Sequence, residues 1–481
     1  MGKASSPSLT SQAISPKEMF GTIDPIVFDA VEYVKPSQLS IRPGNPRVHT
    51  DTSVEAIARA VVATRVMTPI ISDDANVIVA GEGRHRAALL LGLATVPVLR
   101  VAGLSEDQLQ AFRLADNRVA ELSSFDDTRL AVALKDFSSR DLGFNIEHLG
   151  FKHAEIDIRI SGLDEPIDLE NDAADLVTDV SGPVTSRLGD VWLCNRHRIV
   201  CGSALERSTY DALMRGDKAQ MSIQDTVYNV SKNHIGGKGS IKHADFVMGN
   251  GEFSDGEFNT FLFDELDLAQ DHCVKGAIIM AFMDWRSIDK LITAGKAAKM
   301  ELINLCVWNK SNASMGSLYR SKHELIAVFK KPGARHRNNV MLGSYGRSRS
   351  NVWDMPGCNS FGKDRMTELS SHPTVKPVAL IADAIRDVSN RDEIVLDSFL
   401  GSGTTIIAAE RTSRIGYGIE LDPIYVDTAV RRWEQYTGRE ALLEATGQSF
   451  AQVAADRIDP IAPPAKPQVS PRPRTRFVAV A

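Results

Sequence analysis

The chain of 481 residues lacks a hydrophobic run long enough to cross a membrane. A spanning helix needs about 18 to 20 consecutive apolar residues, and every apolar stretch here is shorter. Residues 1–17 are rich in serine and lack the apolar centre of a secretion signal. We therefore expect a cytoplasmic protein that has no membrane partner.

Paired cysteines are also lacking. The five cysteines are an odd number, and none belongs to a Cys-x-x-Cys pair or has a histidine at the spacing of zinc ligands. They are Cys194, Cys201, Cys273, Cys306 and Cys358. This pattern argues against a disulfide scaffold, and it predicts reduced thiols and no metal site.

The chain has no excess of positive charge. Its 55 Lys and Arg residues face 61 Asp and Glu residues, which gives a net charge of −6. This balance argues against a protein that coats nucleic acid through bulk charge, but it allows a DNA enzyme with a local basic surface. The length and the 43% hydrophobic content predict more than one core, and hence about two or three domains.

Changes in composition divide the chain. The Ser/Pro-rich start and the Pro/Arg-rich end offer too little apolar surface to fold, and residues 164–179 carry acids without any basic residue. The predicted parts are a disordered N-terminus (1–25), an α+β domain (26–150), an acidic linker region (151–186), an α/β catalytic domain (187–445) and a flexible C-terminal tail (446–481).

Local patterns predict the elements of the two domains. Helices over 54–62 and 84–91 alternate with strands over 69–72, 77–80 and 95–101 in the first domain. In the second domain, apolar strand segments alternate with helical segments, which is typical of a largely parallel sheet covered by helices.

A glycine-rich turn gives the strongest local signal. An apolar strand ends at Asp397, the sequence Ser-Phe-Leu-Gly-Ser-Gly-Thr-Thr follows, and a helix is predicted over 406–411. Glycines let the backbone approach a ligand, and free amides at a helix start attract a carboxylate or phosphate. The next strand, 415–419, ends at Glu420, which can accept hydrogen bonds from ribose hydroxyls. The alternatives are an ordinary tight turn, a dinucleotide site or an S-adenosylmethionine site.

A second strand ends in a carboxylate, at Asp225, and Tyr228 follows three residues later. Ligands bind at the carboxyl ends of strands in α/β sheets, so both side chains are candidates for catalysis. A carboxylate can accept the hydrogens of an amine, and an aromatic ring can stack on a flipped base.

These segments resemble the DNA amino-methyltransferase family in its permuted beta class. The glycine turn with Gly418-Ile-Glu-Leu-Asp-Pro, and His372-Pro-Thr-Val-Lys-Pro, look like its cofactor segments. Residues 225–228 look like its Asp-Pro-Pro-Tyr motif, although Thr226 and Val227 replace the prolines and Ser398 replaces another. The resemblance implies a Rossmann-like domain that transfers a methyl group from S-adenosylmethionine to double-stranded DNA.

The family implies roles for individual residues. The aspartate at 225 favours adenine-N6 as the target, while cytosine-N4 methylation or a catalytically weakened protein stays open because of the altered motif. The implied catalytic residues are Asp225, Thr226, Val227 and Tyr228. The implied cofactor contacts are Asp397, Phe399, Gly401, Ser402, Gly403, Thr404, Glu420, Thr374 and Lys376.

A third segment resembles the wall of the family's target-base pocket. Its residues are Trp308, Lys310, Tyr319, Arg320 and His323, and Lys238 in the basic loop 234–242 is a further candidate for DNA contact. The alternatives are that Trp308 belongs to the core, that Arg320 and Glu324 form an i,i+4 pair on a helix, and that the loop is a solvated surface.

The first domain carries Gly81-Glu-Gly-Arg-His-Arg at a strand-to-helix junction, which resembles the Gly-Glu-Arg-Arg box of ParB-like domains. The resemblance implies that Gly81, Glu82, Arg84 and Arg86 bind a nucleotide or a protein partner. Gly83 replaces the first arginine, which argues against nucleotide hydrolysis. Alternatively, both arginines belong to a solvated helix face. The methyltransferase resemblance also implies a homodimer.

Overall fold

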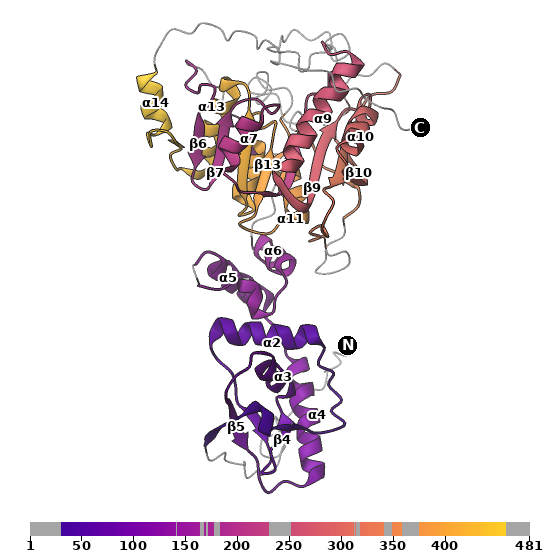
Figure 1. The fold of residues 1–481 in the computed structure, drawn as a ribbon, viewed down its shortest axis with the longest axis vertical. Helices are drawn as coiled ribbons and strands as arrows, with labels where there is room; N and C mark the ends of the chain where they lie inside the picture. Colours follow the sequence, from indigo (N-terminus) through magenta and orange to yellow (C-terminus); the bar gives the residue numbers. More distant parts are fainter. Residues whose placement is uncertain are drawn as a thin grey trace, which may run out of the picture. The chain divides into compact units, whose positions relative to one another are not determined.

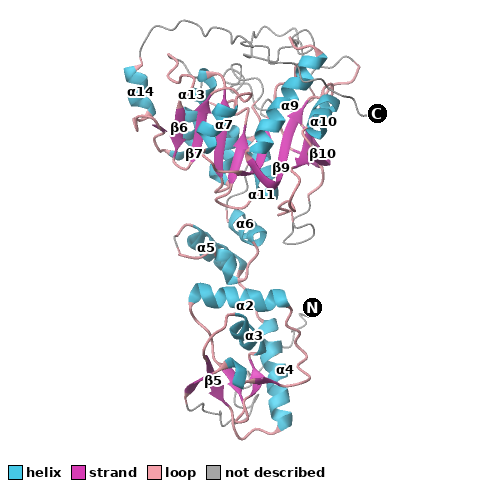
Figure 2. Ribbon diagram, viewed as in Figure 1, coloured by secondary structure: helices cyan, strands magenta, loops and turns pink. Residues whose placement is uncertain are grey.

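The protein divides into two compact units, residues 1–152 and 153–481. Figure 1 shows the helices and strands coloured by their position in the sequence, and Figure 2 shows them coloured by secondary structure. The computed structural model describes residues 30–140, 142–163, 168–169, 172–177, 183–229, 252–311, 313, 318–340, 349–357 and 375–457. In these ranges, no helix is long and apolar enough to cross a membrane. The predicted disordered N-terminus, 1–25, lies outside them.

The first unit is an α+β fold with a five-stranded sheet in the order β1-β5-β3-β4-β2. Its strands are β1 (Val31–Val34), β2 (Ser40–Ile41), β3 (Ile70–Ser72), β4 (Val77–Ala80) and β5 (Val96–Arg100). Its helices are α2 (Asp51–Thr64), α3 (Glu82–Leu90), α4 (Glu106–Leu122) and α5 (Asp127–Ser138). The predicted helices and strands are all present, and apolar residues of β3, β4 and β5 form a core with Ala88 of α3.

The second unit contains a ten-stranded sheet in the order β12-β10-β11-β9-β8-β13-β14-β7-β6-β15. The strands are β6 (Val191–Cys194), β7 (His197–Cys201), β8 (Ala219–Gln224), β9 (Cys273–Met283), β10 (Glu301–Asn309), β11 (His323–Lys330), β12 (Val352–Asp354), β13 (Ile394–Asp397), β14 (Ile415–Glu420) and β15 (Leu442–Leu443). The five strands from β9 to β7 pair in parallel, as predicted. Most pairs towards the edges are antiparallel, so the sheet is mixed.

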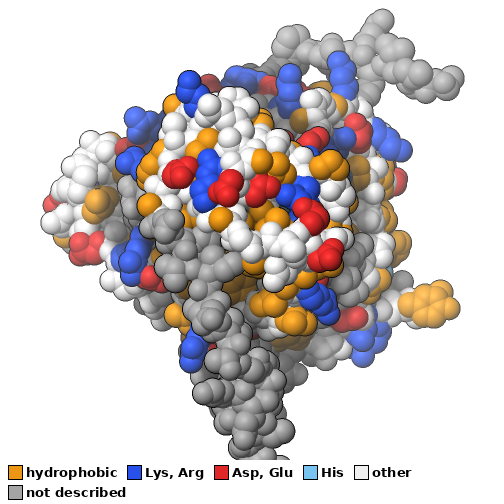
Figure 3. Space-filling view, turned by 90° about the horizontal axis from the view of Figure 1, so that it is seen from below, with side chains coloured by type: hydrophobic (Ala, Val, Ile, Leu, Met, Phe, Trp, Pro, Cys, Tyr) orange, Lys and Arg blue, Asp and Glu red, His pale blue; other side chains and the backbone are white. Residues whose placement is uncertain are grey.

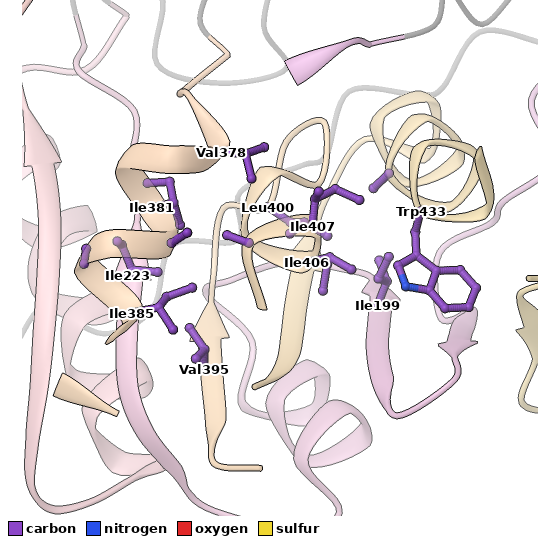
Figure 4. Packing of buried hydrophobic residues seen from close by; sticks show 14 of the residues in the cluster. Ile199, Ile223, Val378, Ile381, Ile385, Val395, Leu400, Ile406, Ile407 and Trp433 are labelled. Atoms are coloured by element: carbon purple, nitrogen blue, oxygen red, sulfur yellow. The ribbon is translucent and has the colours of Figure 1, made fainter. Parts of the chain in front are cut away.

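Helices cover both faces of this sheet. On one face lie α11 (Val378–Val388), α12 (Thr404–Arg411) and α13 (Pro423–Thr437), and on the other lie α7 (Arg207–Met214), α9 (Asp255–Asp271) and α10 (Ile288–Ala297). Side chains alternate along a strand, so Ile223 of β8 packs against the α11 face while Ser222 and Gln224 point to the other face. Figure 4 shows Ile381 and Ile385 of α11 near Ile223.

The strand order reverses between β8 and β13. From β8 the chain continues to β9 on one side, whereas from β13 it continues to β14 on the other side. Ligands of open α/β sheets bind at the carboxyl ends of the strands at such a reversal. The topology therefore brings Asp225, Asp397 and Glu420 to one edge of the sheet, at or just after the ends of three neighbouring parallel strands.

Part of the predicted acidic linker packs into the second unit. Helix α6 (His153–Ser161) buries Asp157, which pairs with Arg414 at 2.5 Å and Arg391 at 2.7 Å. Asp172 is buried and pairs with Arg411 at 2.6 Å. The prediction of an acidic linker is wrong for these residues, because arginines more than 200 positions away neutralise the acids and hold them in the second unit.

The predicted flexible tail also begins with a folded segment. Helix α14 (Phe450–Asp456) starts at a capping box on Ser449, and the Phe450 ring lies 5.0 Å from the ring of Trp192. The tail prediction is therefore wrong for these residues, while residues 458–481 lie outside the described ranges.

We predict that Asp157→Asn lowers the free energy of unfolding by about 3 kcal/mol, because it leaves the fully buried guanidinium of Arg414 without a carboxylate. Urea unfolding of the full chain measures this change. The control Asp271→Asn removes an exposed pair with Arg207 and should cost less than about 1 kcal/mol. Equal effects of the two variants would contradict a structural role for α6.

Candidate active site

The candidate active site begins at Asp225, the first residue after β8. One carboxylate oxygen, Oδ2, lies 2.5 Å from the Nζ atom of Lys376, and the other accepts a hydrogen bond of 2.8 Å from the hydroxyl of Tyr228. Lys376 stands two residues before α11, so this contact joins the end of a central strand to the approach of a helix 151 positions later. Both oxygens of the candidate catalytic acid are therefore engaged within the protein.

Glu324 extends the network. Its Oε2 atom lies 3.0 Å from the Tyr228 hydroxyl and 3.2 Å from Lys376, and its Oε1 atom bonds to Lys310. Burial alone would raise the pKa of Glu324, but the ammonium groups of Lys376 and Lys310 lower it to about 2. Burial would lower the pKa of Lys376, but Asp225 and Glu324 raise it above its usual value. The site thus holds two carboxylates and two ammonium groups.

Burial, Asp225 and Glu324 all raise the pKa of Tyr228, so its hydroxyl keeps its proton. That hydroxyl has one hydrogen to donate and two carboxylates within reach, so it bonds to one of them at a time.

The loop after Asp225 keeps its shape without prolines. Thr226 is 2% exposed, and Val227 packs against an apolar cluster of α9 and α10. Asn229, in a left-handed conformation with φ of 50°, donates to the carbonyl of Phe253 at 2.9 Å and accepts from its amide at 3.2 Å. Packing and these hydrogen bonds thus constrain the segment that prolines would otherwise stiffen.

The glycine turn joins β13 to α12. Gly403 has a φ of 86°, and a Cβ there would lie 2.8 Å from the Cβ of Ala429, so a close approach to α13 requires glycine. Gly401 has a φ of 54°, and a Cβ there would meet no atom within 4 Å. No other atom therefore covers the Cβ side of the Gly401 backbone.

Two acids hold this turn. Glu420 accepts from the amides of Gly401 at 2.8 Å and Asp422 at 2.9 Å, and Asp397 accepts from the amide of Phe399 at 2.9 Å and the hydroxyl of Thr405 at 2.6 Å. Burial raises the pKa of each acid to about 7. Each oxygen keeps a second lone pair, so both acids also have capacity for a ligand.

The other predicted cofactor residues contact different parts of the protein. The carbonyl and hydroxyl of Ser402 and the hydroxyl of Thr404 accept from Arg432, so both side chains contribute to the link with α13. The Phe399 ring is partly buried and lies 6.0 Å from the ring of Phe261. Lys376 contacts Asp225, and Thr374 lies outside the described residues.

The predicted base-pocket residues do not form one group. Trp308 is 2% exposed, belongs to the core and donates to the carbonyl of Met355. Lys310 reaches Glu324, but Tyr319 is 85% exposed and Arg320 donates to the carbonyl of Ala313. The proposed helix pair of Arg320 and Glu324 is wrong, because Glu324 lies in β11.

His323 begins the same strand, β11, and lies opposite Asn309 of β10. Lys238 lies outside the described residues.

Sequence reasoning missed Glu324 as a charged partner of the site and Asn229 as a clamp. Glu324 follows His323 within the segment that resembles the pocket wall, so its presence was visible. Its partners were not, because Lys310, Lys376 and Tyr228 come from three separate parts of the chain.

The first unit has a cavity of about 450 Å³ beside the start of α3. Its walls include the predicted Gly81, Glu82 and Arg84, but Arg84 donates to the carbonyls of Thr68 and Pro69, and Arg86 pairs with Glu82. A side chain at Gly83 would lie 2.8 Å from Ile57, so an arginine does not fit there without rearrangement. The two predicted arginines are thus engaged in structural contacts.

Other basic residues line this cavity, and sequence reasoning missed them. They are Arg42, Arg47, His49 and Arg113. Arg42 pairs with Asp73 and Glu106, while Arg47 donates to Asn117 at 3.0 Å. Elsewhere, basic and acidic side chains are interspersed on the face of the molecule shown in Figure 3.

Residues 219–431 match the model of a family described as DNA methylase. The Type II methyltransferase M.ScaI of Streptomyces caespitosus is 35% identical over 105 residues, which are 22% of this chain and 34% of that protein. The chain spans between 34% and 57% of the length of five curated relatives that it matches. The resemblance of this part of the chain to DNA methylases is confirmed.

Two solved structures are similar to different parts of the chain. The M1.HpyAVI–SAM complex is 20% identical, covers 49% of this chain and 98% of its own, and has a TM-score of 0.35. The chromosome-partitioning protein ParB of Caulobacter crescentus, complexed with CTP-gamma-S, is 22% identical, covers 29% of this chain and 82% of its own, and has a TM-score of 0.26.

We predict that the protein without ligand loses stability as the pH rises from about 5 to about 8, by roughly 1 kcal/mol or more from Glu420 and Asp397. Their folded pKa values near 7 exceed the ordinary values of 4.5 and 3.8, so the folded state binds more protons in this range. Their contribution is complete below the ordinary values and is lost through pH 7. Thermal unfolding across this range measures it, and Glu420→Gln should flatten the dependence. An unchanged slope in that variant would contradict the assignment.

Proposed function

We propose that the second unit transfers a methyl group from S-adenosylmethionine to the exocyclic amine of a base in double-stranded DNA, with adenine-N6 as the favoured target. The observation that carries this proposal is the meeting of Asp225 with the glycine turn at the ends of the neighbouring strands β8, β13 and β14. The match of residues 219–431 to DNA methylases supports it.

The arrangement suits an amine that reacts poorly by itself. The lone pair of an exocyclic amine is delocalised into the base, and acceptors for its hydrogens favour the form that attacks. Asp225 and the carbonyl of Thr226 supply such acceptors. With the methyl donor bound, the amine nitrogen would take up the methyl group, the electron pair of the broken carbon–sulfur bond would stay on sulfur, and Asp225 would pass the proton released by the nitrogen to solvent.

The glycine turn fits the methyl donor chemically. No atom covers the Cβ side of Gly401, which favours close approach of a ligand to the backbone, and Glu420 has lone pairs for ribose hydroxyls. Asp397 and Glu420 together favour a cationic ligand when they are ionised. When bound, S-adenosylmethionine supplies an electrophilic methyl group on a sulfonium.

The altered catalytic motif is compatible with activity. The packing of Val227 and the bonds between Asn229 and Phe253 constrain the loop after Asp225. This favours an active enzyme over a weakened one. The preference for adenine over cytosine rests on the aspartate at position 225 and its resemblance to adenine enzymes.

We predict that the full chain incorporates labelled methyl groups from S-adenosylmethionine into unmodified genomic DNA, and that Asp225→Ala lowers the rate at least about 100-fold. Asp271→Ala is the matched control, because this acid precedes β9 at the opposite edge of the sheet and should leave the rate within about twofold. Digestion of the product identifies the modified base.

The outcome decides between the alternatives. If N4-methylcytosine is the only product, the assignment to adenine is wrong. If the native protein is inactive and Thr226→Pro with Val227→Pro creates activity, the protein is a weakened enzyme, and the proposed function is wrong for the native chain.

We also propose that the cavity of the first unit binds an anionic ligand of nucleotide size. Arg47, Arg113 and His49 line it beside the start of α3, where backbone amides favour anions. Burial lowers the pKa of His49, so the histidine is neutral near pH 7 and the arginines supply the positive charge. The carboxylate of Glu82 opposes an anion there, but its pairing with Arg86 reduces this effect.

We predict that titration calorimetry with each of the four ribonucleoside triphosphates detects binding of at least one, and that Arg113→Ala weakens it about tenfold or more. Arg129→Ala, on the exposed side of α5, is the control and should leave binding unchanged. Absence of binding by every triphosphate, or equal affinity of the Arg113 variant, would exclude this cavity as a nucleotide site.

A further inference from the structure

We propose that Lys376 and Asp225 together read the edge of the target base: Asp225 accepts from the exocyclic amine while Lys376 donates to the adjacent ring nitrogen. This inference rests on the proposed methyl transfer and deepens it. It restricts the substrate to bases whose Watson–Crick edge carries an amino group beside an unprotonated ring nitrogen, namely adenine and cytosine. It also assigns to Lys376 the task of keeping the methyl group off that ring nitrogen.

The geometry places a donor beside an acceptor. The Nζ atom of Lys376 lies 2.5 Å from Oδ2 of Asp225, so the ammonium and the carboxylate present neighbouring groups of opposite character. Adenine and cytosine present the complementary pair, since one carbon atom separates the amine, a donor, from the ring nitrogen, an acceptor. A flipped base that brings its amine to Asp225 therefore brings its ring nitrogen towards Lys376.

Lys376 has a hydrogen left for this contact. An ammonium group carries three hydrogens. Two of them serve Asp225 at 2.5 Å and Glu324 at 3.2 Å, while the third faces the Tyr228 hydroxyl at 3.5 Å, which is long for a hydrogen bond. An incoming ring nitrogen offers a better acceptor than that hydroxyl. Lys376 can thus bind the base without losing either carboxylate.

Glu324 holds the ammonium in place when the base arrives. Glu324 belongs to β11, and it bonds to Lys376 with one oxygen and to Lys310 with the other. Both of its oxygens are thus used to position lysines, and the exocyclic amine of the base is left to Asp225. The two carboxylates and two ammonium groups balance each other. A neutral base therefore enters a site whose charges are already compensated, which avoids the cost of an unpaired buried charge.

The chemistry requires such a donor. The ring nitrogen beside the amine has an in-plane lone pair that is not delocalised, so it attacks a methyl electrophile more readily than the amine does. A hydrogen bond from Lys376 occupies this lone pair, and the amine nitrogen then attacks in the step described above. In the corresponding places, guanine and thymine carry a carbonyl oxygen and a ring N–H. The carbonyl oxygen would meet Asp225, which is also an acceptor, and the N–H would meet Lys376, which is also a donor, so neither hydrogen bond can form.

The experiment compares target bases in a duplex that the native protein methylates. If the target is adenine, one duplex carries 1-deazaadenine, which has C–H in place of the ring nitrogen, and the matched control carries 7-deazaadenine, altered at the other edge. For a cytosine target, 3-deazacytosine and 5-methylcytosine take these places. We expect kcat/KM to fall about tenfold or more for the first substitution, and less than about threefold for the control.

A variant then tests Lys376 itself. In Lys376→Met the loss caused by the deaza base should shrink to less than about twofold, and the share of ring-nitrogen methylation on ordinary DNA should rise, as measured by mass spectrometry of DNA digested at neutral pH. Thermal unfolding and calorimetric binding of S-adenosylmethionine show whether the variant is folded. Lys376→Gln, which keeps a neutral donor, should retain part of the sensitivity.

Two results would overturn the inference while leaving methyl transfer intact. One is equal loss with the two deaza bases in the native protein. The other is an undiminished loss with the 1-deaza or 3-deaza base in a folded Lys376→Met protein. A native protein that methylates no DNA would instead refute the proposed function, and the inference with it, so the two failures are distinguishable.

Discussion

The candidate site depends on the buried ion pair between Lys376 and Asp225. Removing two charges from water is costly, and their attraction compensates only when further hydrogen bonds satisfy the remaining donors and acceptors. Here Glu324, Tyr228 and Lys310 supply those bonds. Because the partners come from the segments that follow β8 and β10, from β11 and from the approach to α11, the pair aligns four segments at one edge of the sheet.

The same use of distant opposite charges explains how the acidic stretch before β6 folds. Asp157 and Asp172 meet Arg391, Arg414 and Arg411, which belong to α12 and the connections around β13 and β14. The arginines that hold this stretch therefore lie next to the glycine turn along the chain. Local composition alone indicates that these acids face solvent, but their ion pairs with distant arginines allow Asp157 and Asp172 to be buried.

Much of the fold was predictable because its signals are local. The strand that ends at Asp397, the glycine turn, and the strand that ends at Glu420 are consecutive in the sequence, and β9 is an apolar run typical of a strand covered on both faces. The contacts of Glu324 were not predictable from local sequence. Its partners Tyr228, Lys310 and Lys376 are distant in the chain, and only the order of the strands in the sheet brings them next to β11. The error over Arg320 and Glu324 came from assuming a helix where strand pairing prevails.

The bonds between Asn229 and Phe253 have a consequence for how this protein can vary. The side chain of Asn229 bonds to the backbone of Phe253, so these two residues are held together by groups outside the stretch between them. The entropy of closing a loop grows only slowly with its length. A change in the length or sequence of the chain between these two residues is therefore compatible with an unchanged geometry at the end of β8.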